Sequence, residues 1–126
     1  MKELVPGLKL SIEEKVTSDN VATAIGSGAL DVYSTPSMIA LMEKASMLCV
    51  DDCINAEQTT VGGLVNIRHV KATALGRIVF CESKVSAVDG KKIEFEVSAY
   101  VDGVLIGSGY HTRFIVNKQK FMNMLK

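Results

Sequence analysis

The stretch 34–50, STPSMIALMEKASMLCV, constrains the fold more than any other part of the chain. Ser34 or Thr35 can cap the first backbone N–H groups of a helix, and Pro36 fits the first helical position, where its missing donor costs nothing. A helix is therefore predicted to begin near Pro36. Its apolar side chains leave no polar stripe as wide as that of a surface helix, which predicts burial on nearly every side. Glu43 is the exception, and its carboxylate lies either at a solvated edge or in a partly dry site that tunes its ionisation.

Strand patterns dominate the rest of the chain. Alternation of apolar and polar residues predicts strands at 8–16, 64–73, 77–88, 91–100 and 104–116. Asp-Gly pairs at 89–90 and 102–103 are strong hairpin signals between the last three strands. Residues 17–33 are a long connection without a clear period, which serves either as a lid over a binding site or as a passive crossover. Residues 118–126 form a short amphipathic helix that Asn117 can cap.

One long apolar helix and five strands predict an α+β fold in which a curved sheet buries the helix. The expected order is a strand, the helix and then four strands in an antiparallel meander. The whole chain, residues 1–126, is the size of a single domain. Such a sheet leaves an open edge that a second copy can pair with, which predicts a homodimer or a higher oligomer.

Composition excludes several classes of protein. No apolar run approaches the roughly 20 residues that cross a bilayer, so no membrane span is expected. Fourteen basic and fourteen acidic side chains give a formal charge of zero, unlike the basic surface of most nucleic-acid binders. The N-terminal residues show no export signal, which predicts a cytoplasmic location. Cys49, Cys53 and Cys81 are an odd count that suits free thiols, and no metal site is expected because no His or further Cys completes a ligand set.

Three spacings along the chain match one known family. Thr35 is followed eight residues later by Glu43, within Leu-Met-Glu-Lys-Ala. Gly62 is followed seven residues later by His69, and the stretch 107–113 reads Gly-Ser-Gly-Tyr-His-Thr-Arg. In this order the three matches resemble the fluoroacetyl-CoA thioesterase family, and the resemblance runs over most of the chain.

The resemblance implies a hot-dog fold, in which a five-stranded antiparallel sheet wraps around a central helix. It also implies hydrolysis of a short-chain acyl-CoA to the free acid and coenzyme A, with no metal and no other cofactor. Carried over residue by residue, Thr35, Glu43 and His69 are the expected catalytic set, and Gly62 and Arg113 are the expected substrate-binding residues.

The chain departs from the family in the segment before the helix. There the family's namesake closes its pocket with phenylalanines, whereas this chain has no phenylalanine before Phe80. Ala29, Leu30, Val32 and Tyr33 occupy the segment instead. The resemblance therefore implies a more general short-chain acyl-CoA substrate rather than one selected by its fluorine.

The catalytic candidates fit the needs of thioester hydrolysis, which are a nucleophile or positioned water, a base and donors for the oxyanion. Thr35 at a helix N-terminus either attacks or orients the carbonyl, or is an ordinary cap. His69 has the near-neutral pKa of a general base, with a structural histidine as the alternative. Glu43 can orient His69 or act on the substrate itself. Whether Thr35 is acylated or only positions water stays open.

The binding candidates have simpler alternatives. Gly62 allows close approach of the substrate or is only a turn glycine, and Arg113 contacts Glu43 or the acyl carbonyl or is a surface cation. His111 alternates to the same face as Arg113 and has no assigned role. The candidates for the coenzyme A phosphates are Arg68, Lys71, Lys91 and Lys92, which the sequence does not rank.

Two other functions remain open at this point. A hot-dog hydratase or dehydratase would need a group that moves a proton beside the thioester carbonyl, and the match at Thr35 argues against it. A non-catalytic module that binds acyl-CoA or another small ligand would use the same fold, because fold alone does not determine function.

Overall fold

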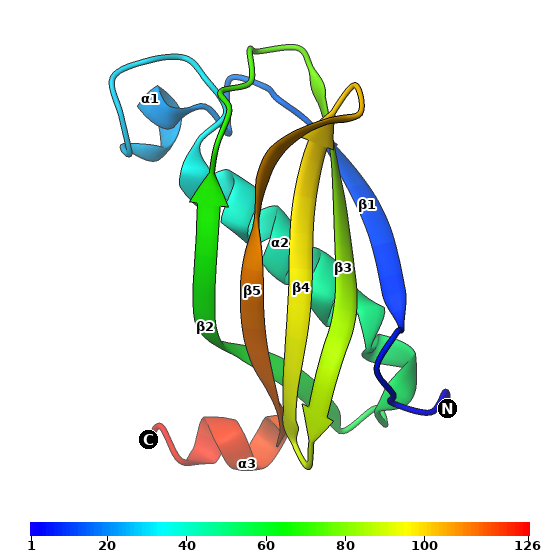
Figure 1. Ribbon diagram of the computed structural model, residues 1–126. Coiled ribbons are helices and arrows are strands. Elements are labelled where there is room, and N and C mark those ends of the chain that lie inside the picture. The colour runs from blue at the N-terminus through cyan, green and yellow to red at the C-terminus, as the bar shows by residue number, and fades with distance from the viewer.

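The computed structural model describes all 126 residues. It contains one antiparallel sheet, and a long helix crosses one face of that sheet (Figure 1). The elements are β1 (Lys9–Lys15), α1 (Ala22–Ile25), α2 (Thr35–Cys49), the 3-10 helix η1 (Asp51–Cys53), β2 (Gln58–His69), β3 (Ile78–Asp89), β4 (Lys92–Val101), β5 (Val104–Asn117) and α3 (Lys118–Asn123). A core cluster of 16 buried residues lies between α2 and the sheet. The five predicted strands and the central helix are therefore confirmed.

The strands lie in the order β1-β3-β4-β5-β2, and all neighbours are antiparallel. The two predicted Asp-Gly hairpins join β3 to β4 and β4 to β5, with Gly90 and Gly103 at positive φ. The predicted four-stranded meander is wrong, because β2 precedes β3 in the chain but pairs with β5 at the far edge. Alternation identifies a strand but not its partner, which pairing across the whole sheet decides.

The limits of β2 also differ from the prediction of 64–73. The strand begins at Gln58 and ends at His69, so the Gly62-Gly63 pair lies within it rather than before it. The register against β5 shifts between Gly62 and Leu64, which is a β-bulge. The bulge interrupts the alternation, and this explains why the first half of the strand escapes detection in the sequence.

Helix α2 begins at Thr35, and the hydroxyl of Ser34 caps it by accepting from the backbone N–H of Ser37. The buried residues follow the spacing of a single helical face, at Met38, Leu41, Met42, Ala45 and Ser46. Ala40 and Lys44 are exposed on the opposite face. The prediction of burial on nearly every side is therefore wrong for the single chain, because one sheet covers only one side of a helix.

The two short helices lie at opposite ends of the sheet (Figure 1). Helix α1 interrupts the 17–33 connection, which isolated bridges from Val21 to Tyr33 and from Val32 to Ala74 tie down. Asn117 caps α3 by accepting from the N–H of Lys120, as predicted. None of the helices is long and apolar enough to cross a membrane.

Candidate active site

Thr35 and His69 meet where the N-terminus of α2 lies beside the C-terminal end of β2. Thr35 Oγ1 is 2.7 Å from His69 Nδ1, a hydrogen-bond distance. Because Ser34 supplies the helix cap, the Thr35 hydroxyl is not needed for capping. The interpretation of Thr35 as an ordinary N-cap is therefore wrong, and its hydroxyl is available for chemistry.

The surroundings of His69 favour its neutral form. Tyr33 packs edge-on against the ring, with 6.5 Å between the ring centroids, and its hydroxyl donates to Glu14 Oε2 at 2.7 Å. Burial lowers the pKa of His69 from its ordinary value, because a low-dielectric site disfavours the charged imidazolium. His69 Nε2 is buried and has no hydrogen-bond partner in the chain. In the neutral tautomer that carries its proton on Nε2, Nδ1 accepts from the Thr35 hydroxyl, and in this state His69 can act as a base.

A cavity of about 280 Å³ opens beside this pair, with Thr35, His69 and Lys71 among its lining residues. The 17–33 connection contributes part of the wall through α1 and the residues after it, namely Ala22, Ser27 and Val32. Residues 17–33 therefore do more than connect two elements, since they help to enclose the space next to the reactive pair.

The basic residues that are candidates for binding the coenzyme A phosphates lie in different parts of the structure. Lys71 lines the cavity next to Thr35 and His69. Arg68 instead lines a hollow on the outer face of the sheet, and Lys92 pairs with Glu94 at 3.5 Å. Lys91 lies in the turn that joins β3 to β4. Of the four cations, only Lys71 lines the cavity beside Thr35 and His69.

Glu43 lies apart from the other two expected catalytic residues. It is eight residues along α2 from Thr35, which corresponds to about 12 Å of helix. Its Oε2 is 3.8 Å from Arg113 Nη1, and it makes no hydrogen bond to His69. One chain therefore brings Thr35 and His69 together but does not bring Glu43 to them.

Arg113 is held by a dense set of hydrogen bonds. Its Nε donates to Thr60 Oγ1 at 2.7 Å and its Nη2 to the Thr60 carbonyl at 2.8 Å. Its Nη1 donates to His111 Nε2 at 3.2 Å. Arg113 is only 6% exposed, so the interpretation as a surface cation is wrong. Burial lowers the pKa of Arg113, and the nearby Glu43 carboxylate opposes that shift.

Thr60 and His111 belong to this cluster and were not predicted as functional residues. Alternation did place His111 on the face of Arg113, but nothing in the sequence indicates the pairing of β2 with β5. That pairing sets Gly62 opposite Arg113 and brings Thr60 within reach of the guanidinium. Long-range strand register is therefore the missing signal.

Gly62 is exposed and lies against the Glu43 carboxylate, so it is more than a turn glycine. A Cβ atom at Gly62 would lie 2.9 Å from Glu43 Oε2 and 3.4 Å from His111 Cε1. The resemblance makes Glu43 an expected catalytic residue. We therefore expect Gly62→Ala to push its carboxylate aside and to lower kcat for the expected thioester hydrolysis about tenfold or more, because small misplacements of a catalytic group are costly.

Stability should change little in Gly62→Ala, because the atom that must move is the end of a flexible side chain. Kinetics on acyl-CoA together with thermal unfolding check this expectation. Gly76→Ala is the comparison variant, since a Cβ there meets nothing within 4 Å although its positive φ strains the backbone. Full activity in Gly62→Ala would contradict a role for the Glu43 position.

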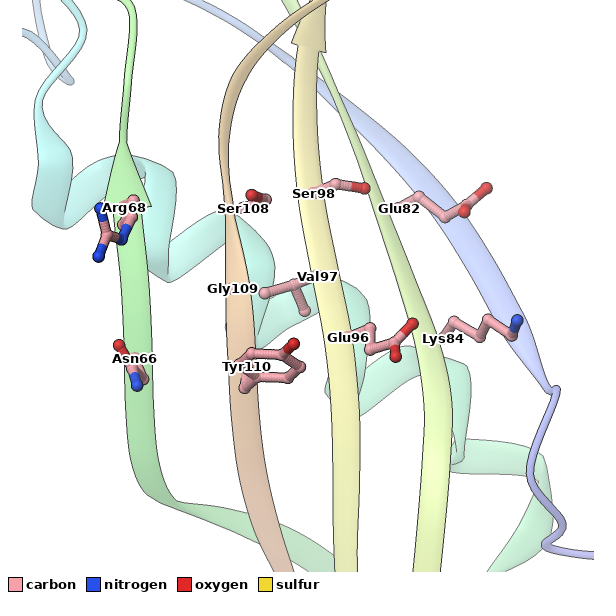
Figure 2. Close-up of a pocket in the computed structure, with 10 residues that line it drawn as sticks. All are labelled: Asn66, Arg68, Glu82, Lys84, Glu96, Val97, Ser98, Ser108, Gly109 and Tyr110. Atoms are coloured by element: carbon pink, nitrogen blue, oxygen red, sulfur yellow. The ribbon is translucent and has the colours of Figure 1, made fainter.

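The largest cavity lies elsewhere, on the face of the sheet that points away from α2 (Figure 2). It measures about 660 Å³, and Figure 2 shows Arg68, Glu82 and Glu96 around it. It contains none of Thr35, Glu43 and His69. Thr35 and His69 line a different and smaller cavity.

Residues 16–119 match the family described as fluoroacetyl-CoA-specific thioesterase. The chain belongs to this family. It is also 32% identical over 92 residues to the fluoroacetyl-CoA thioesterase of Streptantibioticus cattleyicolor. That alignment covers 72% of this chain and 66% of the relative, so it spans just under two thirds of the relative's length.

Solved structures support the assignment of the fold. A fluoroacetyl-CoA thioesterase superimposes with a TM-score of 0.93 at 22% identity, covering 98% of this chain and 96% of the other. A hot-dog-like protein from Thermanaerovibrio acidaminovorans superimposes with a TM-score of 0.87 at 19% identity, covering 95% and 89% of the two chains. The hot-dog fold and the resemblance to the thioesterase family are therefore confirmed, whereas the expected homodimer stays a prediction.

Proposed function

We propose that the protein hydrolyses the thioester of a short-chain acyl-CoA to the free acid and coenzyme A. The observation that carries this proposal is the 2.7 Å contact between Thr35 Oγ1 and His69 Nδ1 beside a cavity. Membership of a thioesterase family supports the same enzyme class. The small volume of the cavity favours a short acyl group.

The proposed reaction begins with His69 taking a proton from the Thr35 hydroxyl or from a water that this hydroxyl positions. The oxygen attacks the thioester carbonyl, and the N-terminus of α2 stabilises the oxyanion through its partial positive charge. The carbon–sulfur bond then breaks, and the protonated His69 returns the proton to the departing sulfur. If Thr35 has been acylated, water attacks the ester in a second step with His69 again as the base. The bond between the acyl carbon and Thr35 Oγ1 then breaks, His69 returns the proton to Oγ1, and the free acid leaves.

We propose that Glu43 enters this site from a second copy of the chain. β2 is an edge strand, and its apolar Leu64 and Val65 are about half exposed. Two β2 strands paired antiparallel around Asn66 would set Gly63 opposite the partner's His69. The Glu43–Arg113 cluster, which adjoins Gly62, would then approach the partner's pair of Thr35 and His69.

Two further observations support a homodimeric site. His69 Nε2 lacks a hydrogen-bond partner within one chain, which is uncommon for a buried polar atom. The Glu43 side chain is 42% exposed although its ion-pair partner Arg113 is buried, so the carboxylate remains accessible to a second copy. A carboxylate near His69 would stabilise the imidazolium that forms during the reaction.

The cavity walls suggest what the substrate looks like. Val32 and Tyr33 line the cavity, and the segment that contains them has no phenylalanine. We therefore infer an acyl pocket without selection for fluorine, and we place the phosphates of coenzyme A near Lys71. No metal or redox cofactor is part of the proposed reaction.

Thiol release from a panel of short acyl-CoAs, including acetyl-, propionyl- and fluoroacetyl-CoA, tests the proposal. We expect turnover of several members, with no strong preference for the fluorinated one. Calorimetric binding without turnover across the panel would instead support a ligand-binding module. Hydration of an enoyl-CoA without thiol release would favour a hydratase.

The pH dependence of the reaction follows from the burial of His69. A base acts in its neutral form, and burial lowers the pKa of His69 below the ordinary value of about 6.5. The Glu43 carboxylate of a second copy opposes this shift, because a nearby negative charge favours the imidazolium. The residual activity of Glu43→Gln, measured by thiol release in buffers of constant ionic strength, should therefore show the acid limb of kcat/KM below about pH 6.5 and at a lower pH than the wild type. An acid limb above pH 7 in Glu43→Gln would contradict His69 as the base.

A further inference from the structure

We propose that His111 is a positioning residue, a neutral imidazole that holds the Arg113 guanidinium in place and through it the Glu43 carboxylate. The proposal deepens the thioesterase function and rests on it. His111 lies on β5, and its ring nitrogens have different partners from two strands.

The partners of the ring determine its tautomer. His111 Nδ1 is 2.7 Å from the Leu64 carbonyl, which can only accept a hydrogen bond. His111 Nε2 is 3.2 Å from Arg113 Nη1, which can only donate one. The proton therefore sits on Nδ1, and the lone pair of Nε2 points to the guanidinium.

The surrounding elements keep the ring in this state. His111 is 1% exposed and stacks on Phe95 of β4, with 6.1 Å between the centroids. The charged groups that face it are Arg113 on its own strand and Glu43 on α2. Burial lowers the pKa of His111, and Arg113 lowers it further. A protonated ring would lose its acceptor and place a second cation beside the guanidinium.

The contacts of Arg113 show why this acceptor matters. Thr60 takes the hydrogen bonds of Nε and Nη2, so Nη1 is the nitrogen left to face Glu43. Nη1 reaches Glu43 Oε2 only at 3.8 Å, whereas it reaches His111 at 3.2 Å. No hydrogen bond of the chain holds the Glu43 carboxylate. The two bonds to Thr60 set the plane of the guanidinium, and His111 supplies the third, at Nη1, the nitrogen that faces the carboxylate. A side chain at 111 that does not accept this bond leaves Nη1 as a buried donor without a partner and loosens the group that attracts Glu43.

Two polar substitutions test the two ring nitrogens of His111 separately. In His111→Gln the amide oxygen can reach the place of Nε2 and accept from Arg113. In His111→Asn the shorter amide can replace only Nδ1 and keep the bond to Leu64. We expect kcat within about threefold of wild type for His111→Gln and a loss of about 10–100-fold for His111→Asn, with KM nearly unchanged in both.

A double-mutant comparison distinguishes positioning from a general structural effect. In a Glu43→Gln background, His111→Asn should cost little further activity, because the carboxylate that it positions is already gone. Equal losses in the Gln and Asn variants, or the same loss with and without Glu43, would overturn the proposal. Thermal unfolding of every variant shows whether each one folds.

A second measurement is independent of activity. The chain has two histidines, so ¹⁵N NMR of the wild-type imidazoles gives two ring systems, and a His69 variant assigns them. We expect His111 to carry its proton on Nδ1 and to remain neutral as the pH falls through about 6.5, where a free histidine titrates. A proton on Nε2 would overturn the proposal. Absence of any thiol release by the wild type would instead reject the thioesterase function and leave this measurement valid.

Discussion

Thr35→Val and His69→Gln are each expected to lower kcat/KM for thioester hydrolysis by about 10²–10⁴-fold, the usual contribution of general base catalysis. Thr35→Val keeps the shape of the side chain but removes the hydroxyl that lies 2.7 Å from His69 Nδ1. His69→Gln removes the ring that accepts the proton. Steady-state thiol release with a short acyl-CoA measures both effects.

Thr35→Ser is the matched control for the first variant, because it keeps the hydroxyl at the N-terminus of α2. It should retain most of the activity, and all three variants should fold, since Ser34 rather than Thr35 caps the helix. If Thr35→Val hydrolysed the substrate as well as Thr35→Ser, neither attack by Thr35 nor positioning of water by it could be part of the mechanism.

The second large effect is expected when two inactive variants are mixed so that they form dimers with each other. Thr35→Val and Glu43→Gln should each be nearly inactive alone, whereas their mixture should recover about a quarter of the wild-type activity. A mixed dimer holds one site with both defects and one intact site, which joins Thr35 and His69 of one chain to Glu43 of the other. Half of a randomly mixed population consists of such dimers. The variants can be exchanged by refolding them together before the assay.

A mixture of Thr35→Val with His69→Gln is the control for this experiment. In the proposed dimer, one chain supplies both Thr35 and His69 to a site. Every site in this mixed dimer therefore keeps one defect, and no activity should return. Recovery in the control mixture, or no recovery with Glu43→Gln, would show that the proposed division of the site between two chains is wrong.

Local patterns were enough to predict most of the secondary structure. The helix signal at 34–50 and the alternating strands reflect the burial of one face, which neighbours in the sequence encode directly. The Asp-Gly hairpins were equally visible, because Gly90 and Gly103 adopt positive φ in tight turns. The short α1 was missed, since only four residues of helix carry too little periodicity to stand out.

The amino-acid sequence by itself determined the family, the hot-dog class and the identities of Thr35, Glu43 and His69 as candidates. Only the tertiary structure decided which of them meet. Strand register sets Gly62 opposite Arg113, and helix geometry keeps Glu43 about 12 Å along α2 from Thr35. Register and the direction of buried hydrogen bonds depend on residues far apart in the chain, whereas sequence patterns report local periodicity. For this reason the roles of Thr60 and His111 emerged only from the folded protein.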